Sequence, residues 1–341
     1  AINRTIQVAV NLRKDNSLRF YAGDLGERKR TTLGNLKYKR EDRWANHIKV
    51  AIYVFAELGY PARGLNFTIV GDIPRQAELA SSTAIEVAAA TALKSFFKVS
   101  IPDKDLLAAL VRAELEFLGR ETVNPVDYLV TFCAKKDQFL LIDERNLEVA
   151  RIKSPFTRFK MILMDSRVPR VGVEEELKQR KEDTRRGLEL LSKKRPGKSF
   201  RDYVSSDLLE SLGNIREEIR RRSLHIVEEN QRIREAADAL KKGDLEELSR
   251  IIYHSHESLR DLYEVSCPEI DWLVKRSQEI EGVTASRMTG LGFGGCTYTI
   301  LKEKALEEFQ RRLEDYERIF GFHPLIYDIR PATGARVISK G

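Results

Sequence analysis

The stretch from Ser286 to Cys296 has the densest glycine content in the chain, with four glycines in six residues at Gly290, Gly292, Gly294 and Gly295. A run of strand-forming residues follows it directly. Glycine has no Cβ, so such a stretch lets the backbone approach a ligand or another segment closely. The pattern predicts a loop held between two sheet elements. Taken alone, a glycine-rich turn without a ligand explains it equally well.

Length and composition favour a globular chain of two domains. The 341 residues are 42% hydrophobic, which is ample for two cores. We find no apolar run long enough to span a bilayer and no signal peptide at the start, so we expect no membrane partner. The net charge of +7 is modest. Basic clusters such as Arg220–Arg222 and Lys193–Arg195 are therefore interpreted as solvated faces, and no nucleic-acid partner is expected.

The three cysteines lie far apart in the sequence, at Cys133, Cys267 and Cys296. Their number is odd and their spacing fits no zinc site, so a reduced, cytoplasmic setting is expected. His225, with the nearby Glu228 and Glu229, could suggest a metal site, but a solvated helix face is the favoured interpretation.

A second segment has the order of elements that suits phosphate binding. Leu65–Val70 is predicted to be a strand, a polar loop follows, and Ile85–Phe97 is predicted to be helical. A helix N-terminus offers unpaired N–H groups and about half a positive charge to an anion. Ser81 and Ser82 stand at this terminus as hydroxyl donors. An ordinary helix N-cap is the alternative explanation for both serines.

Other elements are predicted from hydrophobic periodicity. Thr5–Leu12 is expected to form a strand with Leu18–Tyr21 as its partner, and Gly23–Arg40 is expected to be a loop. Arg43–Leu58 has its apolar residues on one helical face, with a packed histidine, His47, beside that face. Near the end of the chain, Arg336–Ile338 is expected to be a strand.

Two blocks together, Ser255–Asp271 and Ser286–Cys296, resemble the C-terminal signature of galactokinases, which belong to the GHMP family of small-molecule kinases. The similarity extends, with gaps, from about Ala1 to the C-terminus. It implies an α+β fold of two GHMP-kinase domains, with mixed β-sheets packed against helices and an active site between the domains. The N-terminal domain is expected over residues 1–170 and the C-terminal domain over 171–341.

The resemblance also implies site residues. Asp127 matches the catalytic aspartate, which would accept the proton of the sugar 1-hydroxyl, or stabilise the polarised hydroxyl, as the γ-phosphoryl group arrives. Glu114 matches a magnesium ligand, with Ser82 as a second ligand. Asn124 falls on a family glycine beside the sugar. A helix cap is the alternative explanation for Asp127.

ATP and Mg²⁺ are the implied cofactors. The implied phosphate contacts come from Ser81, Ser82 and the glycines Gly290, Gly292, Gly294 and Gly295. The implied partner is a small sugar, and the protein is expected to be a monomer or a homodimer.

The sequence also departs from the galactokinase pattern. The family carries a sugar-binding motif ahead of the residues equivalent to Ala1–Arg4, so either the sequence lacks its true start or the protein never had this motif. Gln76, Ala77 and Glu78 replace glycines of the phosphate loop, Leu177 replaces a sugar-contacting tyrosine, and Leu291 replaces a small residue. Three functions therefore stay open: a galactokinase, an inactive homologue that binds or regulates, and a kinase for a different sugar or polyol.

Overall fold

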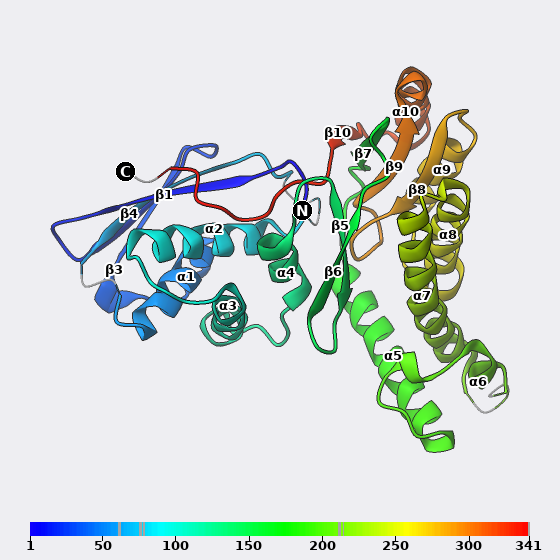
Figure 1. Cartoon of the computed structure of the whole chain (residues 1–341), viewed down its shortest axis with the longest axis horizontal. Helices are drawn as coiled ribbons and strands as arrows, with labels where there is room; N and C mark the ends of the chain where they lie inside the picture. Colours follow the sequence, from blue (N-terminus) through cyan, green and yellow to red (C-terminus); the bar gives the residue numbers. More distant parts are fainter. Residues whose placement is uncertain (61–62, 75–76, 78, 211–212, 214, 340–341) are drawn as a thin grey trace. The chain divides into compact units, whose positions relative to one another are not determined.

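In the computed structural model of the chain, residues 1–60, 63–74, 77, 79–210, 213 and 215–339 are described. The chain divides into two units (Figure 1). The first unit contains the described residues of Ala1–Arg75, Leu79–Arg151 and Pro331–Gly341. The second contains those of Ile152–Arg330 and of the short segment Gln76–Glu78.

The first unit is built on a four-stranded sheet in the order β1-β4-β2-β3. Its strands are β1 (Ile6–Leu12), β2 (Ser17–Ala22), β3 (Glu27–Thr32) and β4 (Leu65–Gly71). Strand β4 is antiparallel to β1 and parallel to β2, while β2 and β3 form a hairpin. Along β2 the side chains alternate between buried and more exposed. This period of two gives the sheet one face toward the core and one toward solvent.

Four helices share one hydrophobic core with this sheet. They are α1 (Ala45–Glu57), α2 (Ser81–Phe96), α3 (Asp103–Leu118) and α4 (Pro125–Cys133), with α1 and α2 along one side of the sheet in Figure 1. Ile48, Ile52 and Phe55 of α1 are fully buried, at the spacing of one helix face. Two 3₁₀ turns, η1 (Leu33–Asn35) and η2 (Arg40–Asp42), precede α1, and the hairpin β5 (Gln138–Asp143) and β6 (Glu148–Lys153) follows α4.

The second unit has a four-stranded antiparallel sheet in the order β10-β7-β9-β8. Its strands are β7 (Phe159–Asp165), β8 (Val283–Met288), β9 (Cys296–Lys302) and β10 (Leu325–Ile329). Helices α8 and α9 pack against β8. The described helical elements of this unit are α5 (Val173–Lys194), η3 (Phe200–Asp202), α6 (Ser205–Leu209), α7 (Glu217–Lys242), α8 (Leu245–Ser258), η4 (Leu259–Tyr263), α9 (Pro268–Gln278), η5 (Glu303–Ala305) and α10 (Leu306–Phe320).

The α+β class expected from the sequence is confirmed, and several element predictions are corrected. The first strand is confirmed, but its partner is β4 and not the Leu18–Tyr21 strand. The predicted loop Gly23–Arg40 contains β3, an edge strand of mostly charged residues, which hydrophobic periodicity cannot detect. Residues 336–338 form no strand.

The division of the chain also differs from the expected boundary after residue 170. It falls between Arg151 and Ile152, because β7 pairs with β9 and β10 of the second unit. The chain then returns to the first unit at Pro331, which bridges to Ile2. The Gly334 N–H donates to the Ala134 carbonyl at the end of α4. Among the described residues, none of the helices is long and apolar enough to cross a membrane.

Candidate active site

Five polar side chains meet among the helices of the first unit, and we call them the acid cluster: His47, Glu86, Glu114, Asp127 and Tyr128. Each of the four helices contributes: α1 carries His47, α2 Glu86, α3 Glu114, and α4 both Asp127 and Tyr128. Glu86 and Tyr128 are fully buried. A carboxylate at such depth is uncommon unless it is paired or functional.

Hydrogen bonds join four of the five members. The Tyr128 hydroxyl lies 2.7 Å from Glu114 Oε2 and also contacts Glu86 Oε2. The other oxygen of Glu86, Oε1, lies 2.7 Å from His47 Nδ1. Arg120 Nε is 3.9 Å from Glu114 Oε1. No other lysine or arginine among the described residues forms an ion pair with these carboxylates.

Burial makes the cluster electrostatically unusual. It raises the pKa of Glu86, an effect that the hydrogen bond from His47 only partly offsets. Burial also raises the pKa of Asp127, with a further contribution from the negative charge of Glu114. A group whose pKa is raised by burial and by a neighbouring like charge is a candidate acid or base.

Asp127 is not the cap of its helix. Asn124 is the N-cap of α4, and its Oδ1 accepts a hydrogen bond of 3.0 Å from the Val126 N–H. Pro125 occupies the first helical position, where its missing N–H costs nothing. Within the described part of the chain, no hydrogen bond or ion pair involves the Asp127 carboxylate. The cap explanation for Asp127 is therefore wrong, while the sugar contact expected of Asn124 stays a prediction.

The serines at the start of α2 are not caps either. The N-cap position is Ala80, whose backbone has the left-handed φ of 51°, and no side-chain hydrogen bond caps this helix among the described residues. Ser81 and Ser82 are the first two helical residues. No described side chain therefore caps the N–H groups at this helix start, which can donate hydrogen bonds to an anion. Gln76 and Glu78, the departures in the preceding loop, lie outside the described residues.

The glycine-rich loop belongs to the second unit and connects β8 to β9, as the sequence predicted. All four glycines have positive φ values, from 79° to 115°. A Cβ on Gly292 would lie 2.2 Å from the Val265 carbonyl oxygen, and a Cβ on Gly294 would lie 3.0 Å from Val168 Cβ. Contacts within the second unit thus already require a glycine at Gly292 and leave little room for a side chain at Gly294. Their contact with phosphate stays a prediction.

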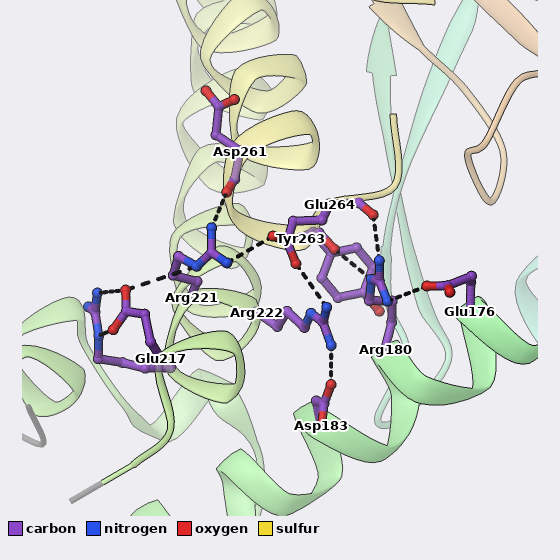
Figure 2. A network of polar contacts seen from close by, with 10 residues as sticks. Glu176, Arg180, Asp183, Glu217, Arg221, Arg222, Asp261, Tyr263 and Glu264 are labelled. Atoms are coloured by element: carbon purple, nitrogen blue, oxygen red, sulfur yellow. Dashed lines mark hydrogen bonds and ion pairs between the residues drawn. The ribbon is translucent and has the colours of Figure 1, made fainter. Parts of the chain in front are cut away.

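A polar network, which we call the arginine network, lies beside this loop (Figure 2). It contains Glu176, Arg180, Asp183, Glu217, Arg220, Arg221, Arg222, Asp261, Tyr263 and Glu264. Arg180 donates hydrogen bonds to the carbonyls of Tyr263 and Glu264. Its guanidinium carbon also lies 5.7 Å from the centre of the Phe293 ring in the glycine-rich loop. The network therefore helps to hold the loop in place.

The predicted solvated face around His225 is wrong. His225 is buried, its Nδ1 lies 2.8 Å from Ser258 Oγ, and its ring stacks on Tyr263. Glu229 pairs with Arg232 and Arg287. The described residues contain no group of three or more His, Cys, Asp or Glu side chains that could hold a metal ion.

That finding is compatible with magnesium in a kinase. Mg²⁺ is usually held by one or two carboxylates together with substrate phosphates, rather than by an all-protein cage. Glu114 and Asp127 provide carboxylate oxygens and Ser82 a hydroxyl, all hard donors that suit this ion. The residues present thus fit magnesium, although the ligand roles of Glu114 and Ser82 stay predictions.

Sequence reasoning missed Glu86 and Tyr128, and it treated His47 only as a packed residue. A signal for Glu86 was present, since it is the only charged residue in the run Ile85–Leu93 of α2. A lone carboxylate in a helix that is otherwise apolar indicates a buried partner. No comparable signal marked Tyr128, because a tyrosine on a helix is ordinary core material.

Comparison with known proteins agrees with this architecture. Residues 46–134 match the family described as GHMP kinases N terminal domain, and residues 236–318 match GHMP kinases C terminal. The first match covers all five members of the acid cluster.

Full-length relatives and solved structures extend these matches. A Treponema pallidum (strain Nichols) protein with a provisional galactokinase assignment is 37% identical in an alignment that covers 99% of this chain and 86% of that protein. The galactokinase of Thermotoga petrophila is 31% identical over 99% of this chain and 93% of its own length. The crystal structure of Lactococcus lactis galactokinase complexed with galactose has a TM-score of 0.88 at 25% identity, covering 98% of this chain and 87% of that one. This chain belongs to the galactokinases of the GHMP kinase family.

Proposed function

We propose that the protein transfers the γ-phosphoryl group of ATP to the 1-hydroxyl of galactose. The curated relatives are named galactokinases, and the similar Lactococcus lactis structure contains galactose. The observation that carries the proposal within this chain is Asp127. It is a carboxylate with a raised pKa and no hydrogen-bonding partner among the described residues, placed beside Glu114.

Asp127 is the proposed catalytic residue. A carboxylate with a raised pKa is a better proton acceptor than an ordinary aspartate, so it suits the removal of the sugar hydroxyl proton as the phosphoryl group arrives. Phosphoryl transfer otherwise depends on positioning and on stabilisation of charge. The N–H groups and hydroxyls of Ser81 and Ser82 are proposed to contact the phosphates, since they begin a helix that no described side chain caps.

Glu114 and Ser82 are the proposed magnesium ligands. The bound ion neutralises charge on the phosphates, which a site with several carboxylates could not otherwise tolerate. Gly290, Gly292, Gly294 and Gly295 are proposed phosphate contacts, and Asn124 a sugar contact, on the resemblance alone. We also propose a cytoplasmic setting, since no disulfide joins Cys133, Cys267 or Cys296 among the described residues. The expected monomer or homodimer stays a prediction.

The experiment is an assay of the purified protein with ATP, Mg²⁺ and galactose, in which ADP release is followed and the product is identified by ³¹P NMR. The proposal expects galactose 1-phosphate, and a loss of about 10²- to 10⁴-fold in kcat for Asp127→Ala. Turnover of another sugar or polyol in place of galactose would support the third function considered above. ATP binding without turnover of any sugar would support the inactive homologue.

A further inference from the structure

We propose that Tyr128 is a positioning residue for Glu114: its hydroxyl donates a hydrogen bond to the Glu114 carboxylate, and the Glu86–His47 pair fixes the direction of that bond. This inference rests on the proposed function of Glu114 as a magnesium ligand. It adds three residues, Tyr128, Glu86 and His47, that touch neither substrate nor metal in the proposal but orient the ligand.

The first step is a count of hydrogen atoms. A tyrosine hydroxyl has one hydrogen to donate, and two ionised carboxylates can only accept. Yet the Tyr128 oxygen contacts both Glu86 Oε2 and Glu114 Oε2. One of the two carboxyl groups must therefore donate to Tyr128, while Tyr128 donates to the other.

The surroundings decide which carboxyl group donates. Glu86 has no exposed surface, whereas the Glu114 side chain is 13% exposed and lies 3.9 Å from Arg120. Burial without an arginine or lysine partner among the described residues disfavours the ionised form of a carboxyl group, so the hydrogen is assigned to Glu86. The raised pKa of Glu86 agrees with this assignment.

His47 completes the chain of bonds. Its Nδ1 lies 2.7 Å from Glu86 Oε1, the oxygen that does not contact Tyr128. With a hydrogen on Nδ1, the ring donates to Oε1 and leaves Oε2 as the hydroxyl oxygen of the acid. The order is then His47 N–H to Glu86, Glu86 O–H to Tyr128, and Tyr128 O–H to Glu114.

This order has a consequence for the metal ligand. Every bond points toward Glu114, so Glu114 receives a hydrogen bond on Oε2 and keeps Oε1 for another partner. Carboxylates that bind metals are generally held by such hydrogen bonds, and loss of one typically lowers metal affinity or activity about 10- to 100-fold. Because these hydrogen bonds join residues on four helices, the position of Glu114 on α3 also depends on how α1, α2 and α4 pack.

The test measures metal binding directly. Mn²⁺, as a probe for Mg²⁺, is titrated in the presence of ATP and followed by electron paramagnetic resonance, and steady-state kinetics are recorded in parallel. Tyr128→Phe is expected to weaken Mn²⁺ binding about 10- to 100-fold. It is expected to raise the Mg²⁺ requirement while leaving the KM for galactose nearly unchanged. Tyr53→Phe is the matched control, because the Tyr53 hydroxyl is in the same unit and lies 3.4 Å from an exposed carboxylate, Glu116.

A second pair of variants tests the direction of the bonds. Glu86→Gln can still donate to Tyr128 and accept from His47, so it should shift Mn²⁺ affinity much less than Glu86→Leu, which can do neither. This pair also keeps the proposal testable if Tyr128→Phe does not fold. Equal losses in Glu86→Gln and Glu86→Leu would overturn the assigned direction.

Wild-type Mn²⁺ affinity in Tyr128→Phe, or an equal loss in Tyr53→Phe, would overturn the positioning role. Failure of the proposed function is a separate outcome. It would appear as absent sugar turnover in the wild-type protein, whatever the variants do to Mn²⁺ binding.

Discussion

The acid cluster of the first unit and the arginine network of the second both contain carboxylates with little exposed surface. In the arginine network these carboxylates are paired with arginines, whereas in the acid cluster they have few positively charged partners. In the network, Arg222 pairs with both Asp183 and Glu264, and Arg221 also reaches Glu264 at 2.8 Å (Figure 2). In the acid cluster, Arg120 at 3.9 Å from Glu114 is the closest arginine or lysine among the described residues.

The difference shows in the pKa values. Burial acts to raise the pKa of Glu264, but the hydrogen bond from Arg222 and the nearby arginine charges lower it overall. In the acid cluster, burial prevails and raises the pKa of Glu86 and of Asp127. Carboxylates that are paired with arginines stabilise the fold. Buried carboxylates with few positively charged partners instead indicate a functional site, where a bound cation can supply the missing positive charge.

Loss of Arg222 should cost stability and not chemistry. The Arg222→Ala variant leaves the buried Asp183 carboxylate without its arginine partner, and removal of one member of a buried pair costs about 3–5 kcal/mol. Urea unfolding measures this loss. Arg185→Ala on α5 is the control, since the Arg185 side chain is 59% exposed and its ion-pair partners among the described residues, Glu182 and Glu189, lie on its own helix. Its expected cost is about 0–1 kcal/mol. Equal costs for both variants would contradict the stabilising role of the network.

Acidification should weaken the second unit through His225. Burial lowers the pKa of His225 to about 4, from an ordinary value of 6.5. Between pH 4 and 6.5 the unfolded chain binds a proton at His225 that the folded chain does not bind. The contribution of the buried, neutral His225 to the free energy of unfolding is therefore complete above pH 6.5. It is lost as the pH falls from 6.5 toward 4, by about 2–4 kcal/mol in total.

Urea unfolding at a series of pH values measures the slope, and His225→Gln is expected to flatten it. A wild-type unfolding free energy that stays constant between pH 6.5 and 4 would show that the imidazole can be protonated in the folded state.

The cap of α4 should have the smallest effect. Asn124→Ala removes the side chain that accepts from the Val126 N–H, which typically costs about 1 kcal/mol. Thermal unfolding of the variant checks this value, and Asn124→Asp, which preserves the cap, is the control. Unchanged stability in Asn124→Ala would show that the cap is dispensable. A rise in the KM for galactose in both variants would support the sugar contact predicted for Asn124.

The sequence was most informative where a pattern is local. The strand Ile6–Leu12, the helix after Ser82 and the glycine-rich loop between two strands each follow from spacing or glycine content, and all three are present. The family followed from ordered motifs in the same way. Prediction was weak at the edge strand β3, because its mostly charged residues have no hydrophobic periodicity, and at the boundary near Ile152, because it depends on the pairing of strands far apart in the sequence.

The candidate site shows the same limit. Asp127 and Glu114 were indicated by motif positions, but the link between them was not, because Tyr128 and Glu86 come together only when α2, α3 and α4 pack. The glycines illustrate the opposite case. The sequence left open that they form a turn without a ligand, and contacts within the second unit at Gly292 and Gly294 give a structural reason for glycine at these two positions.

Asp127→Asn tests the central claim most directly, because one variant reports on both charge and chemistry. The substitution keeps the shape of the side chain and removes one negative charge beside Glu114. If the acid cluster holds excess charge for the reaction, the variant should lose galactose phosphorylation by about 10²-fold or more and should unfold at the same or a higher urea concentration than the wild-type protein. A variant that retains activity, or one that loses stability as Arg222→Ala is expected to, would contradict the account.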